Sequence, residues 1–180
     1  TDGDEVRVFN GSGVEFLATL TNVQKKSADI AIGECLRDEP VSALKLHLGQ
    51  VVSKGDRMDF TIQKATELGI TDITPLWSER CEVRLKGERL DKKIEHWQSV
   101  AIAACQQSGR TRVPVIHEPQ YFADWAKNCD EDICLLLHPH QQKPLSDYAT
   151  PTSVALLVGP EGGFSNAEVE LALASGFAGL

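Results

Sequence analysis

The first forty residues alternate between short apolar stretches and polar turns, a pattern typical of antiparallel strands. Residues 5–9 and 14–20 each predict a strand, and they flank Asn10-Gly11-Ser12-Gly13, a sequence that favours a β-hairpin turn. Residues 27–33 show partial alternation and predict a third strand. Three short strands bury little apolar surface by themselves, so this segment is expected to belong to a small barrel or sheet. Residues 37–40 (Arg-Asp-Glu-Pro) are the expected linker.

From residue 44 onward the pattern changes to strands and helices in alternation. Strands are predicted at residues 44–50 and 71–77, and helices at residues 57–68, 90–107 and about 121–127. Asp56 is a candidate N-terminal cap for the first helix, and Gly69 is its expected C-terminal stop. Apolar runs at 133–137 and 154–158 lack alternation, which indicates strands buried on both faces of a parallel sheet. Strands separated by helices predict an α/β domain.

Charge is distributed unevenly along the 180 residues, whose formal net charge is −8. The net charge is −4 over residues 1–44, +3 over residues 45–112 and −7 over residues 113–180. A polyanion responds to a local patch, because remote charges are screened over about 8–10 Å at physiological salt. The middle third could therefore bind RNA or DNA. Alternatively, its Lys and Arg side chains form solvated helix faces paired with nearby acids.

The cysteines and histidines show no ligand spacing typical of a zinc site. The five cysteines are odd in number and include no Cys-x-x-Cys pair, which indicates reduced thiols rather than a disulfide or zinc framework. His47, His96 and His117 are widely separated, so no metal is predicted. No apolar stretch approaches the ~18–20 residues of a membrane-spanning helix, and no secretory leader is recognisable. We therefore expect no membrane partner.

Candidate chemistry lies in two loops that follow the apolar strands, because parallel sheets bind ligands beyond the carboxyl ends of their strands. The first loop is Leu137-His138-Pro139-His140. The second is Gly159-Pro160-Glu161-Gly162-Gly163-Phe164, which leads into Ser165 and Glu168, a capping box for a last helix. Its three glycines allow the backbone to approach a ligand closely.

Glu161 indicates which ligand the second loop accepts. The loop contains no lysine and places a carboxylate where a phosphate-binding loop would present bare amides. A carboxylate suits a cationic or hydroxyl-rich ligand, and S-adenosylmethionine offers an ammonium, a sulfonium and a ribose diol. The alternative is a Gly-Pro turn whose glutamate merely caps the following helix.

The run of residues 157–165 (Leu-Val-Gly-Pro-Glu-Gly-Gly-Phe-Ser) closely resembles the signature of the SPOUT-superfamily ribosomal RNA small subunit methyltransferase E family. Further blocks resemble the same family and occur in family order over nearly the whole chain. They are residues 46–50 (Leu-His-Leu-Gly-Gln), 60–69, 73–81, 103–110 (Ala-Ala-Cys-Gln-Gln-Ser-Gly-Arg), Pro114 and 137–139.

The resemblance implies a partial PUA-like β-barrel at residues 1–41 and a SPOUT methyltransferase domain with a trefoil knot at residues 42–180. It implies S-adenosylmethionine-dependent methylation of N3 of a specific uridine in 16S ribosomal RNA, by a cytoplasmic homodimer acting on that RNA or on the small ribosomal subunit. The family pattern continues past Leu180 with a segment that supplies part of the cofactor pocket and an arginine. Segments at both ends are therefore expected to be missing, and a 1–180 polypeptide is expected to be inactive. A non-catalytic module that binds ribosomal RNA is the alternative.

The site residues follow from this resemblance and from the charge pattern. The expected cofactor-binding residues are Leu137, His138, Gly159, Pro160, Glu161, Gly162, Gly163 and Leu180. The expected RNA-binding residues are Lys54, Arg57, Lys64, Arg80, Arg84 and Arg112. Arg110 is the candidate catalytic cation that stabilises a uridinate, and its alternatives are a phosphate contact or a helix-end salt bridge. For the His138 imidazole, the alternative is a surface or packing role.

Overall fold

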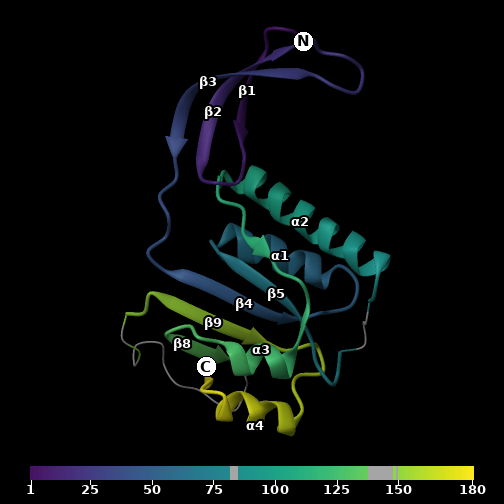
Figure 1. Ribbon diagram of the computed structural model, residues 1–180, viewed down its shortest axis with the longest axis vertical. Coiled ribbons are helices and arrows are strands. Elements are labelled where there is room, and N and C mark those ends of the chain that lie inside the picture. Colours follow the sequence, from purple (N-terminus) through teal and green to yellow (C-terminus); the bar gives the residue numbers. More distant parts are fainter. Residues whose placement is uncertain (82–84, 138–147, 149) are drawn as a thin grey trace.

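A small antiparallel sheet projects from a larger α/β unit (Figure 1). The computed structural model describes residues 1–81, 85–137, 148 and 150–180 of the chain. The small sheet has the order β1-β2-β3, with β1 at Glu5–Phe9, β2 at Val14–Thr21 and β3 at Asp29–Asp38. The predicted hairpin turn is confirmed, since the Asn10 side-chain oxygen accepts a hydrogen bond from the Ser12 backbone N–H at 3.0 Å and β1 pairs with β2 from Phe9↔Glu15 onward.

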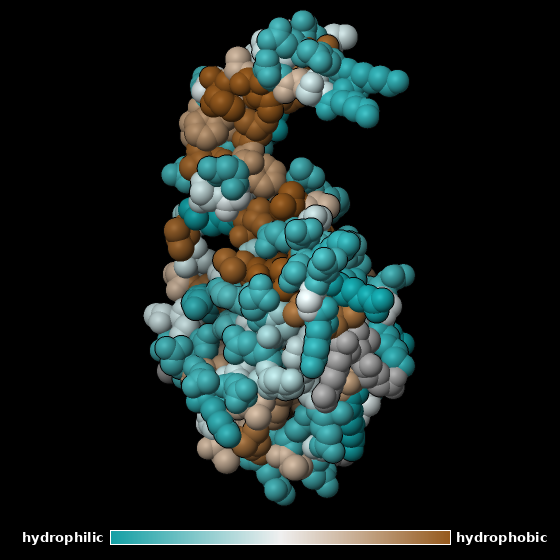
Figure 2. Space-filling view, turned by 45° about the vertical axis from the view of Figure 1, so that its right-hand side comes forward, coloured by the Kyte–Doolittle hydropathy of each residue, from teal (hydrophilic) through white to brown (hydrophobic). Residues whose placement is uncertain are grey.

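Strand β3 is longer than its sequence pattern predicts. Arg37 and Asp38 pair with Glu15 and Val14, so the expectation that both belong to the linker is wrong. β2 continues far enough to keep these residues in the ladder, with register shifts on either side of Phe16 that absorb the mismatch. Apolar side chains gather on the surface of this sheet in Figure 2. In β3, Ile30 and Ile32 are about half exposed, at 48% and 59%.

A parallel sheet forms the centre of the α/β unit, and its order is β10-β8-β9-β4-β5-β6, with β7 also pairing with β5. Its strands are β4 (Lys45–Val51), β5 (Asp72–Trp77), β6 (Val115–Ile116), β7 (Gln120–Tyr121), β8 (Ile133–Leu136), β9 (Ser153–Val158) and β10 (Ala178–Gly179). The two non-alternating apolar runs are β8 and β9, both flanked by other strands, as predicted. The two-residue strands β6, β7 and β10 leave no periodic signal and were missed.

Helices cover both faces of this sheet. α1 (Arg57–Glu67) and α2 (Glu88–Ser108) lie on the face toward the small sheet, and α3 (Phe122–Asn128) and α4 (Asn166–Ala174) lie on the opposite face (Figure 1). Gly69 follows α1 with a φ of +94°, as a C-terminal stop requires. Asp56 does occupy the N-cap position of α1, but its side chain makes no capping hydrogen bond, so that part of the prediction is wrong. Among the described residues, no helix combines the length and the apolar character needed to cross a membrane.

Trp125 on α3 packs closely against the backbone of the central strand β4. A Cβ atom added to Gly49 would lie 2.5 Å from Cη2 of the Trp125 ring. The same ring meets the His47 imidazole edge-on, with centroids 5.2 Å apart, and the Phe177 ring at 5.9 Å. A glycine in β4 is thus what allows α3 to approach the sheet.

The start of α4 is a complete capping box, as its sequence predicts. The Ser165 hydroxyl accepts a hydrogen bond from the Glu168 N–H, and Oε2 of Glu168 accepts one from the Ser165 N–H at 2.9 Å. The second carboxylate oxygen of Glu168 accepts a hydrogen bond from the N–H of Glu79, in the loop after β5, at 2.8 Å. One side chain therefore fixes the start of α4 to the loop after β5.

Replacing Ser165 with alanine should lower the free energy of unfolding by about 1 kcal/mol, because the Glu168 N–H loses its acceptor. Urea denaturation of both proteins measures the difference. Ser175→Ala, at the other end of the same helix, is the control, because there the backbone N–H rather than the side chain makes the closing hydrogen bonds. Equal losses in the two variants would contradict the capping role.

Candidate functional site

The carboxyl ends of the central strands bring the predicted cofactor residues together. The backbone N–H of Leu137, after β8, donates to the Leu157 carbonyl at 3.0 Å. The N–H of Leu180, after β10, donates to the Leu136 carbonyl at 3.0 Å. Because β9 pairs with β8, the loop that begins at Gly159 lies at the same edge. His138 lies outside the described residues.

The loop from Gly159 to Gly163 is a tight turn that leaves its backbone open to a ligand. The Gly163 N–H donates to the Pro160 carbonyl at 2.9 Å, and Gly163 has a φ of +65°, which favours glycine. A Cβ atom at Gly159 would lie 3.1 Å from the buried Phe164 ring. Glycines at these two positions therefore set the shape of the loop.

Glu161 at the tip of this loop forms an ion pair with the first residue of α1. Its Oε1 lies 3.0 Å from Nη1 of Arg57, and the carboxylate side chain is 38% exposed. Its own backbone N–H, the Arg57 guanidinium and the Lys54 backbone together hold the pKa of Glu161 below its ordinary value. Ser165 and Glu168 cap α4, so the alternative that Glu161 serves as the helix cap does not hold.

A cleft of about 670 Å³ separates this loop from the start of α1. Lys54, Arg57 and the exposed ring of Phe60 line it on the α1 side, and Glu161 lines it on the loop side. A smaller adjoining hollow of about 380 Å³ lies between Lys54, Arg80 and the loop. This volume and mixed lining are typical of a small-molecule site. Phe60 could not be predicted as a site residue, because phenylalanine is usually buried, whereas Phe60 is 61% exposed.

Three of the predicted RNA-binding residues border this cleft or the adjoining hollow. Lys54 and Arg57 line it, and Nη1 of Arg80 donates to the Gly162 carbonyl at 2.7 Å. Lys64 lies one turn beyond Phe60 on α1, with Nζ 5.8 Å from the centre of the Phe60 ring, and it pairs with Glu67 at 2.9 Å. Arg84 lies outside the described residues.

Comparison with known proteins shows the family. The family model for the RNA methyltransferase domain matches residues 40–180, and the model for the RNA methyltransferase PUA domain matches residues 1–33. Ribosomal RNA small subunit methyltransferase E of Buchnera aphidicola (subsp. Schizaphis graminum) is 34% identical over 97% of this chain and 72% of its own length. The chain belongs to the ribosomal RNA small subunit methyltransferase E family.

Other similar proteins support the same assignment. The Bacillus subtilis protein of that name is 28% identical over 94% of this chain and 70% of its own length. The Neisseria gonorrhoeae protein of that name, solved bound to S-adenosyl methionine, has a TM-score of 0.89 and 36% identity, covering 100% of this chain and 75% of its own. A Legionella pneumophila protein solved with the bound cofactor has a TM-score of 0.94 and 40% identity, covering 99% and 74%.

The predicted fold class is confirmed: this family member combines a parallel-sheet α/β unit with a PUA-like N-terminal segment. The trefoil knot and a domain boundary between residues 41 and 42 stay predictions.

Arg110 and Arg112 lie at the other end of the sheet in this methyltransferase. Nη2 of Arg110 is 3.1 Å from Oε1 of Glu39, and the guanidinium packs against Gly69, just before β5 begins. Nε and Nη2 of Arg112 donate to the Glu39 carbonyl at 2.8 and 2.6 Å. The six residues of β5 place this end about 17–20 Å from the carboxyl edge. This geometry matches the helix-end salt bridge, while the catalytic role of Arg110 stays a prediction.

Glu39, which follows β3, contacts both Arg110 and Arg112. Burial opposes its ionisation, but hydrogen bonds from Thr111 and the charge of Arg110 outweigh that effect and hold the pKa of Glu39 below its ordinary value. The Thr111 N–H and hydroxyl both donate to Oε2 of Glu39 at 2.8 Å. The segment that joins the small sheet to the methyltransferase unit is thus held by charge and hydrogen bonds.

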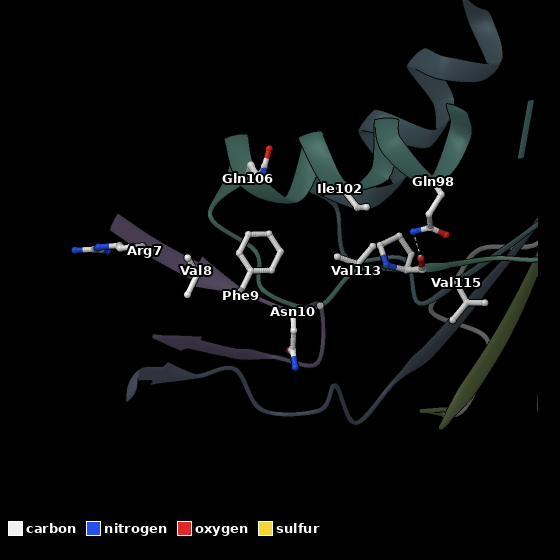
Figure 3. Close-up of a pocket in the computed structure, with 11 residues that line it drawn as sticks. Arg7, Val8, Phe9, Asn10, Gln98, Ile102, Gln106, Val113 and Val115 are labelled. Carbon is white, nitrogen blue, oxygen red and sulfur yellow. Dashed lines mark hydrogen bonds between the residues drawn. The ribbon is translucent and has the colours of Figure 1, made fainter. Parts of the chain in front are cut away.

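A second cavity, of about 560 Å³, lies between the small sheet and α2. Figure 3 shows Phe9 and Val113 near Ile102, which projects from α2 between Gln98 and Gln106. Sequence reasoning could not find this cavity, because its walls come from segments about ninety residues apart and no periodic pattern shows which helix faces the hairpin.

Lowering the pH should reduce the stability of this methyltransferase, in part because Asp72 becomes protonated. Burial raises the pKa of Asp72, but hydrogen bonds from His117 (2.8 Å) and Thr71 lower it by more. A carboxyl group with a lowered folded-state pKa stabilises the fold above its unfolded pKa, and that contribution is lost as pH falls through the folded value. The loss should therefore begin below about pH 5 and continue below pH 4.

Asp72→Asn should lower the free energy of unfolding by about 1.5–3 kcal/mol at pH 7, the usual value for a hydrogen bond to a charged group. The difference from the unmodified protein should shrink toward pH 3, as urea denaturation across this range would measure. Asp130→Asn, an exposed position, is the matched control. A difference that stays constant from pH 7 to pH 3 would contradict the assignment.

Proposed function

We propose that this protein is an S-adenosylmethionine-dependent methyltransferase that modifies N3 of a uridine in the 16S ribosomal RNA of the small subunit. The observation that carries this proposal is the cleft at the carboxyl edge, where a glycine-rich loop with an ionised Glu161 faces Lys54 and Arg57. The family membership, the cofactor in the Neisseria gonorrhoeae relative and the names of the curated relatives support it.

The residues around the cleft fit this cofactor. The backbone at Gly163, where an added Cβ atom would meet nothing within 4 Å, can approach a ribose or an amino-acid group closely. The Glu161 carboxylate attracts an ammonium or sulfonium, and the cleft of about 670 Å³ falls within the usual size range for such ligands. Leu137 and Leu180 border the same edge through their backbone groups. When bound, S-adenosylmethionine supplies a methyl group activated by its sulfonium charge.

The protein's contribution to methyl transfer is alignment and charge. A nitrogen acceptor must lie in line with the carbon–sulfur bond that breaks, and such positioning is worth about 7–11 kcal/mol in favourable cases. The proton on uridine N3 is lost before or during the attack, so cations near the base favour the uridinate. Lys54 and Arg57 border the cleft and supply positive charge there, whereas Arg110 lies near Glu39.

Calorimetry with S-adenosylmethionine and S-adenosylhomocysteine tests the cofactor part of the proposal. Glu161→Gln should weaken S-adenosylmethionine binding about tenfold, because a loss of about 1.4 kcal/mol corresponds to that factor. Glu170→Gln, an exposed position on α4, should leave the binding unchanged. Absence of binding to the unmodified protein would favour the alternative, a non-catalytic module that binds ribosomal RNA.

Methyl transfer to 16S ribosomal RNA tests the reaction and its target. With the complete protein, including the segment expected after Leu180, labelled methyl groups should appear on a uridine, and base-specific mass analysis should place them at N3. Methylation at another base or at another uridine atom would contradict the proposed target while leaving the cofactor assignment intact. The cytoplasmic location and the homodimer stay predictions, and light scattering of the purified protein tests the latter.

RNA binding is proposed for the positive residues around the cleft. Lys54, Arg57 and Arg80 lie within reach of one surface, and Lys64 continues it along α1. Phe60 adds an exposed aromatic face on which a base could stack. This surface carries local positive charge beside the cleft, although the formal net charge of the whole chain is −8.

A further inference from the structure

Two cysteines and a glutamate form a compact cluster at the opposite end of the sheet from the cleft. Cys129 is the C-cap residue that follows α3, Glu131 lies in the following loop and Cys134 is the second residue of β8. One sulfur from each cysteine and one carboxylate oxygen of Glu131 all lie within 4.8 Å of one another. Sequence reasoning missed this arrangement, because Cys-x-Glu-x-x-Cys is not one of the familiar ligand patterns.

The distances suit a tetrahedral metal ion. Zinc binds thiolate sulfur at about 2.3 Å and carboxylate oxygen at about 2.0–2.2 Å, which places ligand atoms about 3.3–3.8 Å apart. The three atoms are already within 4.8 Å, so closing around an ion requires shifts of about 1 Å. Both thiols are half-buried, which leaves a path for an ion to enter.

The carboxylate is held in place by a second layer of hydrogen bonds. Oε1 of Glu131 lies 2.8 Å from Nδ1 of His47, whose Nε2 lies 2.8 Å from the Thr74 hydroxyl. The Glu131 side chain is only 5% exposed and that of His47 only 15%. Ligating carboxylates in metal sites are commonly oriented in this way, and the orienting partner affects the affinity. A plain pair of neighbouring thiols would need neither the buried carboxylate nor its histidine.

We propose that Cys129, Glu131 and Cys134 bind one thiophilic divalent cation, with Zn²⁺ as the expected ion. Two thiols release their protons on binding, and the resulting thiolates, the carboxylate and a water complete four-coordination. The ion would join the end of α3 to β8 and so hold Trp125 against β4. This site is separate from the cofactor cleft and does not depend on the proposed function.

Titration of the metal-free full chain with Co²⁺, in a phosphine reductant and without a histidine tag, tests the site. One equivalent should produce the thiolate-to-cobalt charge-transfer absorption and the intense visible bands of four-coordinate cobalt, and Zn²⁺ should abolish both. Cys129→Ser and Cys134→Ser should each weaken binding at least tenfold, and His47→Gln about tenfold. Cys35→Ser, at an exposed cysteine on β3, should change nothing.

Thermal unfolding tests metal binding without relying on the absorption bands of cobalt. Zn²⁺ should raise the melting temperature of the unmodified chain, because an ion that binds only the folded state stabilises it. The Cys129→Ser/Cys134→Ser variant, checked for folding by circular dichroism without metal, should show no such rise. Lack of a charge-transfer band, or a band that survives in that variant, would overturn the proposal.

Discussion

Trp125→Ala is expected to lower the free energy of unfolding by about 3–5 kcal/mol, the usual cost of removing a large aromatic side chain from a core. The Trp125 side chain is only 4% exposed, and it is the part of α3 that lies over β4. Its loss leaves a cavity bordered by the backbone of Gly49 and the rings of His47 and Phe177. Urea denaturation measures the effect, and Trp125→Phe should cost clearly less.

A double substitution shows whether Trp125 and Gly49 are in direct contact. Gly49→Ala alone should cost about 1–3 kcal/mol, because its Cβ would overlap the Trp125 ring. In the Trp125→Ala background the added methyl group enters the cavity, so the same change should cost little or should stabilise. Additive losses would contradict direct contact between the two residues, because independent sites add within about 0.5 kcal/mol.

Replacing Lys54, Arg57 and Arg80 together with glutamine is expected to weaken binding to 16S ribosomal RNA by about 10- to 100-fold near 0.1 M salt. Each phosphate contact to a single strand contributes about 0.7 to the slope of log K against log salt. The slope should therefore become shallower by about 2. Fluorescence anisotropy over a range of salt concentrations measures both quantities, and calorimetry in parallel shows whether cofactor binding is preserved.

A charge-matched variant controls for the loss of three positive charges. Arg89, Lys92 and Lys127 are exposed residues on α2 and α3 that do not line the cleft. Their replacement with glutamine should leave the salt slope nearly unchanged. An equal loss of affinity in both triple variants would show that overall charge, not the cleft surface, governs RNA binding.

Local patterns in the sequence predict most of the helices and strands, but not which of them pair or pack together. The hairpin, the main strands and helices and the capping box of α4 follow from turn residues and periodicity, which act over a few positions. The pairing of β4 with β9 joins residues about 108 apart, and no periodicity encodes it. The same limit hid the second cavity and the strands of two residues.

In the candidate site, too, only the residues that are contiguous in sequence could be predicted. The loop from Gly159 to Gly163 could be predicted because its glycines and its carboxylate are contiguous in sequence. Arg110, in the block of residues 103–110 that resembles the family, was the candidate catalytic cation. It lies at the amino end of the sheet, beside Glu39, and its catalytic role stays a prediction. The thiol cluster joins the end of a helix to a strand, so its ligand spacing depends on the loop between them rather than on a motif.

The position of β4 in the sheet also determines when the protein can fold. β4 is made early and lies between β5, which soon follows it, and β9, which begins only at Ser153. During synthesis at about 5–20 residues per second, one edge of this central strand waits several seconds for its partner. Pairings between distant segments also form slowly, because a long loop must close first. A nascent chain of this protein therefore exposes an unpaired edge of β4 until β9 emerges from the ribosome.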